Sequence, residues 1–282
     1  MTPVRISAIL DYAMTPRAIA AVAAARDAVD EVLQSPPVFR PGAPRELYDA
    51  RLAAATLHAD AHLEAVDVAA AALADEVTRD CVLGERLRAI AALHARISRD
   101  ASALMQSPPR VLAAWHIRAT AGLGLLDSER GQPREIHKAP LDPLNAGLSI
   151  CEPAAAVGVI VSLLTSNPRG LPPIAQAGLV HLAVTAGGPF AAANGPLGRA
   201  AAHAVLIARG TDPAGRVAVI GALSELGRPA YVRALRAAAV MTDEAIDDWV
   251  SWWCEVVGIG AGYSAALMHD AMRDIEAQQQ PV

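Results

Sequence analysis

The chain has few of the residues on which many functional classes depend. Its 282 residues include two Phe, four Tyr and three Cys, and Lys138 is the single lysine. Cys81, Cys151 and Cys254 lie far apart and lack CxxC spacing. The sequence therefore predicts neither a disulfide framework nor a zinc cluster, and a reducing cytoplasm is the expected location.

Long apolar runs are also missing. The longest covers about Ala154 to Leu164, well short of the roughly 20 residues that a membrane-spanning helix needs. Arg5 and Asp11 stand where a signal peptide would carry its apolar stretch, so we expect no secretion and no membrane partner. The chain is nevertheless 53% hydrophobic, which supplies a core and excludes a disordered protein.

The charge balance excludes a further class. The net charge is -5 and the isoelectric point is about 5.9, which argues against a nucleic-acid partner bound by phosphate neutralisation. The sequence contains 63 Ala and 23 Arg. This bias is typical of a GC-rich, bacterial genome. An arginine is therefore not, by its residue type alone, evidence of a phosphate-binding site.

Apolar residues recur at helical spacing along the whole chain, and signals for strands are scarce. The sequence predicts an all-α fold. The expected helices cover residues 16–34, 45–76, 83–105, 109–124, 152–165, 173–186, 197–209, 228–240, 243–257 and 261–277. Thr242-Asp243-Glu244 is the expected N-cap of the ninth.

The stretch from Leu126 to Ile150 is the longest without a helical pattern, and it could hold a short hairpin or a surface loop. It suggests a division into an N-terminal helical region, 1–125, and a second helical domain, 126–282. Both parts have the same composition, so we expect one continuous globular unit.

Two short patterns have simpler interpretations than the ligand sites they suggest. The sequence GIGAG at 258–262 lacks the spacing and the following strand of a dinucleotide site, so we expect a glycine turn between two closely packed helices. His58 and His62 have zinc-like spacing but no third ligand, which favours two half-exposed histidines on a solvated face over a metal.

Residues 187–199, GGPFAAANGPLGR, form the remaining candidate site. One helix is expected to end at Gly187-Gly188, and the next to start near Leu197. The first backbone amides of a helix lack intrahelical partners and attract anions. Arg199 lies about one turn inside, where it could reach such an anion or pair with a carboxylate elsewhere.

The stretch GPFAAANGPLGR resembles a degraded form of the Fic (Fido) motif, HPFx(D/E)GNGRxxR. Its surroundings are similar too. PPIAQAGLVHLAVTAGGPF resembles the helix that leads into the motif, RAAAHAVLIARG resembles the helix that follows, and YVRALRAAAVMTDEAIDDWVSWWCEVV resembles the C-terminal helix pair. The resemblance covers about residues 130–275 and implies an all-α, Fic-like helical bundle with an N-terminal helical extension.

Fic enzymes transfer AMP or a related phosphate-containing group to a protein hydroxyl, and three functional positions of their motif are changed here. The histidine that removes the hydroxyl proton corresponds to Gly188, which has no side chain to act as a base. The acid that holds magnesium corresponds to Ala192, and the first arginine corresponds to Pro196. The resemblance thus implies no catalytic residue, no metal ligand and a pseudoenzyme that acts through binding or regulation.

The motif residues that remain are Phe190, Asn194, Gly195 and Arg199. The resemblance implies that they could retain ATP or another nucleotide by its phosphates, without a dedicated magnesium ligand. In the family a glutamate can inhibit by pairing with the last motif arginine. DAHLEA at 60–65 faintly resembles that inhibitory element, which makes Glu64 a candidate partner of Arg199, against the simpler interpretation of a surface residue.

Two alternatives remain open. The first is a divergent nucleotidyl transferase that uses another base, with His203 a better candidate than His181. The second is an interaction protein without a ligand, in which Trp249, Trp252 and Trp253 form a protein-partner or homodimer face. Their i, i+3, i+4 spacing is more often typical of a core stripe.

Overall fold

The computed structural model describes residues 5–35, 42–64, 82–142 and 151–279. Within these ranges every regular element is a helix and no strand is present, so the structure confirms the all-α fold. The α-helices are α1 (Ala8–Asp11), α2 (Pro16–Leu33), α4 (Ala43–Leu63), α6 (Val82–Gln106), α7 (Pro108–Ala119), α8 (Pro153–Thr165), α9 (Pro173–Thr185), α10 (Asn194–Ala208), α11 (Val219–Glu225), α12 (Arg228–Ala238) and α13 (Asp243–Gln279). A short 3-10 helix covers Asp127–Glu129.

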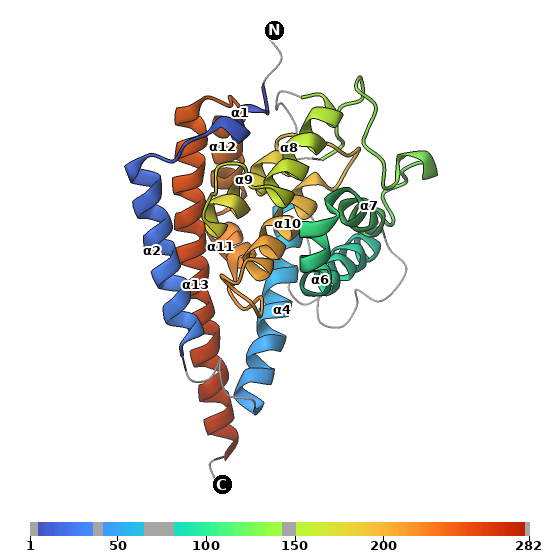
Figure 1. Ribbon diagram of the computed structural model, residues 1–282. Helices are drawn as coiled ribbons and strands as arrows, with labels where there is room; N and C mark the ends of the chain where they lie inside the picture. Colours follow the sequence, from blue (N-terminus) through green and yellow to red (C-terminus); the bar gives the residue numbers. More distant parts are fainter. Residues whose placement is uncertain (1–4, 36–41, 65–81, 143–150, 280–282) are drawn as a thin grey trace.

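The centre of the molecule is the pair α9 and α10 (Figure 1). Every residue from Ile174 to Thr185 is buried, and so is every residue from Asn194 to Ala202. A helix that is apolar on all sides has no face suited to water, so it is stable only when other helices surround it. The small alanine side chains of α10 let its neighbours approach closely.

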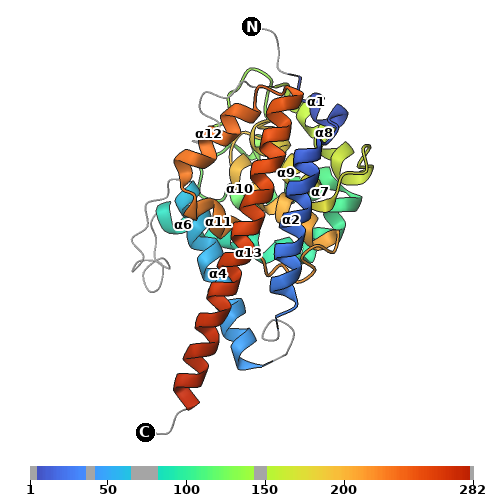
Figure 2. The same ribbon diagram turned by 90° about the vertical axis from the view of Figure 1, so that its left-hand side faces the viewer.

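The longest helix, α13, forms one side of the bundle. Figures 1 and 2 show α2 running beside it in the same direction and α4 beside its C-terminal half. The starts of α2 and α13 are joined through Asp247, which accepts hydrogen bonds from Tyr12 Oη at 2.6 Å and Thr15 Oγ1 at 2.8 Å. Thr242 caps α13 as expected, since its hydroxyl accepts from the amide of Ala245.

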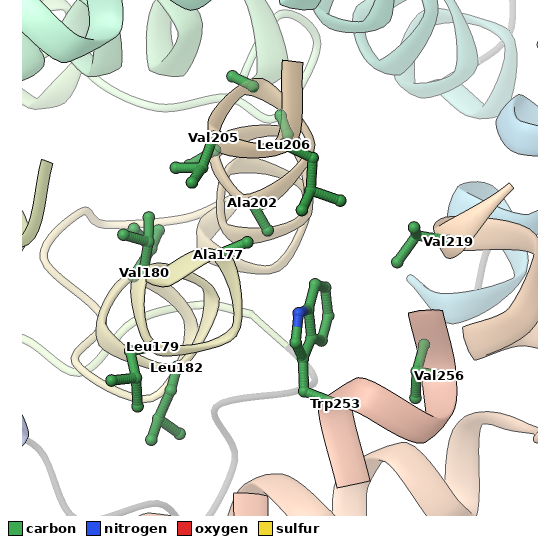
Figure 3. Packing of buried hydrophobic residues seen from close by; sticks show 14 of the residues in the cluster. Ala177, Leu179, Val180, Leu182, Ala202, Val205, Leu206, Val219, Trp253 and Val256 are labelled. Atoms are coloured by element: carbon green, nitrogen blue, oxygen red, sulfur yellow. The ribbon is translucent and has the colours of Figure 1, made fainter. Parts of the chain in front are cut away.

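The tryptophan stripe of α13 lies in the core. Trp249 and Trp253 are only 2% and 1% exposed, and Trp253 projects from α13 toward α9 and α10 (Figure 3). Trp249 Nε1 donates to the carbonyl of Gly178 at 2.8 Å. These two rings therefore pack inside the protein. Trp252 is half-buried and stacks on Tyr231.

Several boundaries differ from those expected. The GIGAG stretch is no turn, because it lies inside the continuous helix α13. Its glycines still serve close packing, since a Cβ on Gly260 would lie 3.0 Å from Val219 Cα. The short helices α1 and α11 were not expected, and α10 starts at Asn194 rather than near 197.

Other expectations fall partly outside the described residues. The helix expected over 45–76 is present as α4 up to Leu63, and 65–76 lie outside the described ranges, as does Cys81. The described part of 126–150 holds the 3-10 helix and loop, without a hairpin strand. Buried side chains from both sides of residue 125 belong to one hydrophobic cluster, while the division into two regions stays a prediction.

None of the helices in the described ranges combines the length and the hydropathy that crossing a membrane requires.

The glycines of the long helices provide a matched test of the packing. A Cβ on Gly178 would lie 2.6 Å from Trp253 Cδ1, whereas a Cβ on Gly258 would meet nothing within 4 Å. We expect Gly178→Ala to lower the free energy of unfolding by about 1–3 kcal/mol through overpacking. The control, Gly258→Ala, should raise it by up to about 1 kcal/mol through helix propensity. Urea denaturation would measure both, and equal effects would contradict the packing of Trp253 on α9.

Candidate functional site

The candidate site is the loop between α9 and α10, and it is closed by its own side chains. Gly188 has φ +51° and Ala193 has φ +60°, so the chain turns twice through left-handed conformations before α10 begins. Asn194 Oδ1 accepts from the amide of Phe190 at 3.0 Å, and Asn194 Nδ2 donates to the carbonyl of Phe190 at 2.9 Å. Phe190 stacks on His116 with ring centroids 4.6 Å apart.

A carboxyl group of the protein itself occupies the start of α10. Asp142 Oδ2 accepts from the backbone amide of Asn194 at 3.0 Å and from its Nδ2 at 2.6 Å. A helix N-terminus is the place where an anionic ligand would bind. Asp142 is 6% exposed, and burial raises its pKa while the bonds from Asn194 oppose that shift.

The segment that carries Asp142 is held across the motif loop by backbone contacts. Arg134 donates through its amide to the carbonyl of Pro189 at 2.9 Å and through Nε to the carbonyl of Gly188 at 2.7 Å. The amide of Leu141 donates to the carbonyl of Ala191 at 2.8 Å. Every residue from 188 to 199 is buried.

Arg199 lies one turn inside α10 and is 1% exposed. Its Nε donates to Asp60 Oδ1 at 2.6 Å, and its Nη2 donates to Glu64 Oε1 at 2.7 Å and also contacts Asp60. Asp60 and Glu64 stand at i and i+4 near the end of α4, which places both carboxyl groups on one face. Glu64 is only 2% exposed, so its interpretation as a surface residue was wrong.

Three further helices complete the surroundings of Arg199. His94 of α6 lies 2.6 Å from Asp60 Oδ2 through its Nε2. Tyr231 of α12 accepts from Arg199 Nη1 at 3.4 Å, and its hydroxyl lies 2.5 Å from His181 Nε2 of α9. Side chains from α4, α6, α9, α10 and α12 thus converge on one buried guanidinium.

The two acids that share Arg199 have opposite pKa shifts. Burial raises the pKa of Glu64 to about 7, and Arg199 opposes that rise. For Asp60, burial acts in the same upward direction, but Arg199 and His94 outweigh it and hold its pKa at about 2. One guanidinium cannot fully compensate two buried carboxylates, so the less well bonded one resists ionisation. Burial also lowers the pKa of His181, which keeps the imidazole neutral.

The structure brings Phe190 and Asn194 together in the loop, and Gly195 follows in the first turn of α10. Arg199 faces the carboxyl groups of α4 instead of the start of its own helix. Sequence reasoning missed Asp142, whose only local signal is its place in a proline-rich stretch. It placed Asp60 in the 60–65 stretch but named only Glu64 as a partner of Arg199.

Few side chains of the candidate site could bind a metal ion. Ala192, which the resemblance to the Fic motif aligns with the magnesium-binding acid, is 3% exposed and has no side-chain oxygen or nitrogen. Across the described ranges no group of three or more His, Cys, Asp or Glu side chains is arranged to hold a metal. His58 and His62 are both exposed on α4.

The arrangement of helices around this loop is that of Fic-domain proteins. One similar solved structure is a Fic family protein from Desulfovibrio desulfuricans G20, at 17% identity and TM-score 0.60, matching 100% of this chain and 79% of that one. A Fic domain containing signaling protein from Bacteroides thetaiotaomicron VPI-5482 matches 89% of this chain and 97% of its own, at 13% identity and TM-score 0.65.

Fic-1 from C. elegans is also similar, at 13% identity and TM-score 0.64, over 88% of this chain and 72% of the fragment in that structure. No protein-family model and no curated protein matches the sequence. At sequence identities this low, the structural similarity establishes the fold alone, and the activity has to be argued from the site.

The motif loop contains strain that one substitution should relieve. Ala193 stands where the family motif has glycine, and it adopts φ +60° and ψ +21°. A left-handed conformation costs a residue with a Cβ about 1–2 kcal/mol. We expect Ala193→Gly to raise the free energy of unfolding by about 0.5–1 kcal/mol after the greater entropy of the unfolded glycine is included.

Thermal denaturation would measure that change. Ala200→Gly, inside α10 where φ is negative, is the control and should lower stability by about 1 kcal/mol or more. Destabilisation by both substitutions would contradict the left-handed geometry at 193.

The raised pKa of Glu64 makes stability depend on pH. Between its unfolded value of 4.5 and its folded value of about 7, the folded protein holds a proton that the unfolded chain releases. This contribution is fully present below pH 4.5 and is lost as pH rises through 7. Relative to Glu64→Gln, the wild type should therefore lose up to about 3 kcal/mol of stability over that range.

Urea denaturation of both proteins between pH 4 and 8 would measure the difference. Glu46→Gln removes an exposed charge from the same helix and serves as the control for surface effects. A difference that grows in favour of the wild type as pH rises would mean that Glu64 is ionised beside Arg199.

Proposed function

We propose that this protein is a catalytically degraded member of the Fic-fold class, a pseudoenzyme that acts through binding or regulation. One observation carries the proposal: the groups that would receive a nucleotide's phosphates already bind carboxyl groups of the same chain. Arg199 pairs with Asp60 and Glu64, and Asn194 pairs with Asp142.

The positions that would supply chemistry support the same conclusion. Gly188 has no side chain to take a proton, and its φ of +51° would strain a histidine placed there. Ala192 offers no oxygen to a metal, and Pro196 offers no charge. Restoring transfer would require at least a base and a way to compensate phosphate charge.

The proposal includes a retained nucleotide site in which the nucleotide competes with these internal contacts. A phosphate would have to displace Asp142 from the amide of Asn194 and Glu64 from Arg199. Protonation of Glu64 near neutral pH would weaken its contact to Arg199, because the ion pair becomes a neutral hydrogen bond. ATP or another nucleotide would then signal by releasing α4 or the 134–142 segment.

The alternative of a substitute base has less support. The His181 side chain is completely buried among Tyr231, Trp249 and Trp253, so the hydroxyl of a target protein could reach it only after a rearrangement of the core. His203 lies four residues beyond Arg199 in α10 and lines a groove that α4 and α6 also form. A role in binding implies a protein partner or homodimer, and the composition favours the cytoplasm.

The test combines binding with transfer. We expect calorimetry to detect no binding of ATP, GTP, CTP or UTP to the wild type up to about 1 mM at pH 8, with or without magnesium. Glu64→Ala with Asp142→Ala frees the amide of Asn194 and removes one of the two carboxyl groups bound to Arg199, while Asp60 stays in place. We expect this double variant to bind nucleotide at least tenfold more tightly. Neither protein should transfer label from radioactive ATP to itself or to a bacterial lysate.

Arg199→Ala in the double variant is the matched control, since it removes the guanidinium that would hold the phosphate. Circular dichroism would verify that each variant is folded. Labelled protein that depends on Arg199 would overturn the pseudoenzyme. Absence of nucleotide binding by the folded double variant would remove the retained phosphate site and leave the partner surface as the functional element.

A further inference from the structure

A groove lies on the side of the molecule formed by α4, α6 and α10, and the proposed function does not use it. Its volume is about 510 Å³, which is within the range of small-molecule sites. Its walls include Leu52 and Leu57 of α4 and Ala91 and Ile97 of α6. These side chains offer an apolar surface without a large aromatic residue that would fill the space.

The inner end of the groove carries an unsatisfied polar atom. His203 Nε2, from α10, is buried and has no hydrogen-bond partner in the part of the chain that the structure describes. Asp212 is the nearest acid, but its Oδ2 lies 4.0 Å away and accepts from the amide of Val217 at 2.8 Å. A buried polar atom without a partner is unfavourable, so a ligand that supplies the partner gains affinity.

Gly215 lies against this atom and brings no side chain to it. It lines the groove with φ +66°, and a Cβ there would lie 3.2 Å from His203 Nε2 and 3.5 Å from Ser98 Oγ. The absent side chain therefore leaves the space in front of the imidazole. The hydroxyl of Ser98 is a second polar group beside the same space.

The charges around the groove select against an ionised ligand. Burial lowers the pKa of His203, although Asp212 opposes that shift, so the imidazole is neutral at pH 7. Asp60 and Asp212 are compensated, by Arg199 and by backbone amides. At the rim, Arg216 pairs with Asp49 at 3.0 Å, so these described charges have partners within the protein and offer none to an ionised ligand.

We propose that the groove between α4, α6 and α10 binds an uncharged, largely apolar alcohol or phenol whose hydroxyl pairs with His203. A hydroxyl both donates and accepts, so it satisfies either neutral form of the imidazole. The ring or chain of the ligand covers the leucine and alanine walls. The site is independent of the motif loop and stands whether or not a nucleotide binds there.

The test uses three probes that differ only at one substituent: 4-ethylphenol, 4-ethyltoluene and 4-ethylbenzoate. Amide chemical shifts in two-dimensional NMR of the full chain would report binding. We expect saturable shifts at residues of the groove with 4-ethylphenol, and at least fivefold weaker binding of the other two. His203→Phe keeps the ring and should abolish the preference for the phenol over the toluene.

A second pair of variants separates the groove from unspecific binding. Ala91→Phe fills the groove from α6 and should weaken the binding of 4-ethylphenol at least tenfold. Ala92→Phe, on the adjacent face of the same helix, should leave that binding unchanged. Equal effects of the two substitutions would overturn the proposal. So would tighter binding of the benzoate, no saturation up to 5 mM, or a concentration-dependent dimer that Ala91→Phe dissociates.

Discussion

The ion pair of Arg199 with Asp60 and Glu64 is the contact on which the arrangement of the bundle depends. All three side chains are at most 2% exposed, and side chains of α4, α6, α9, α10 and α12 surround them. Removing one member of such a group leaves an uncompensated buried charge, typically at a cost of about 3–5 kcal/mol. The ion pair therefore fixes α4 against α10 and also determines the state of the motif loop.

Internal carboxyl groups bind at two points of the motif stretch. Asp142 binds the first amide of α10, and Glu64 binds the arginine one turn further along. Both acids have raised pKa values because burial disfavours their charge. The start of α10 and the guanidinium of Arg199 are thus occupied by carboxyl groups of the same chain.

Much of the fold followed from local pattern. Helical periodicity predicted most helices within a few residues, and Thr242 was correctly placed as a cap. The errors occurred where packing overrides local preference. Glycines 258–262 suggested a turn, yet α13 continues through them, with Gly260 packed against Val219 of α11 while the sides of Gly258 and Gly262 are open. The seven-residue helix α11 is too short for its periodicity to be distinguished from that of a loop.

The sequence by itself determined the helical class and the position of the loop between α9 and α10, since these depend on periodicity and residue type. Only the tertiary structure decided the partners of Asn194 and Arg199. Asp60 and Arg199 are 139 residues apart in the chain and Asp142 and Asn194 are 52 apart. Local pattern carries no information about such pairs, because they form only when α4 and the 134–142 segment pack against α10.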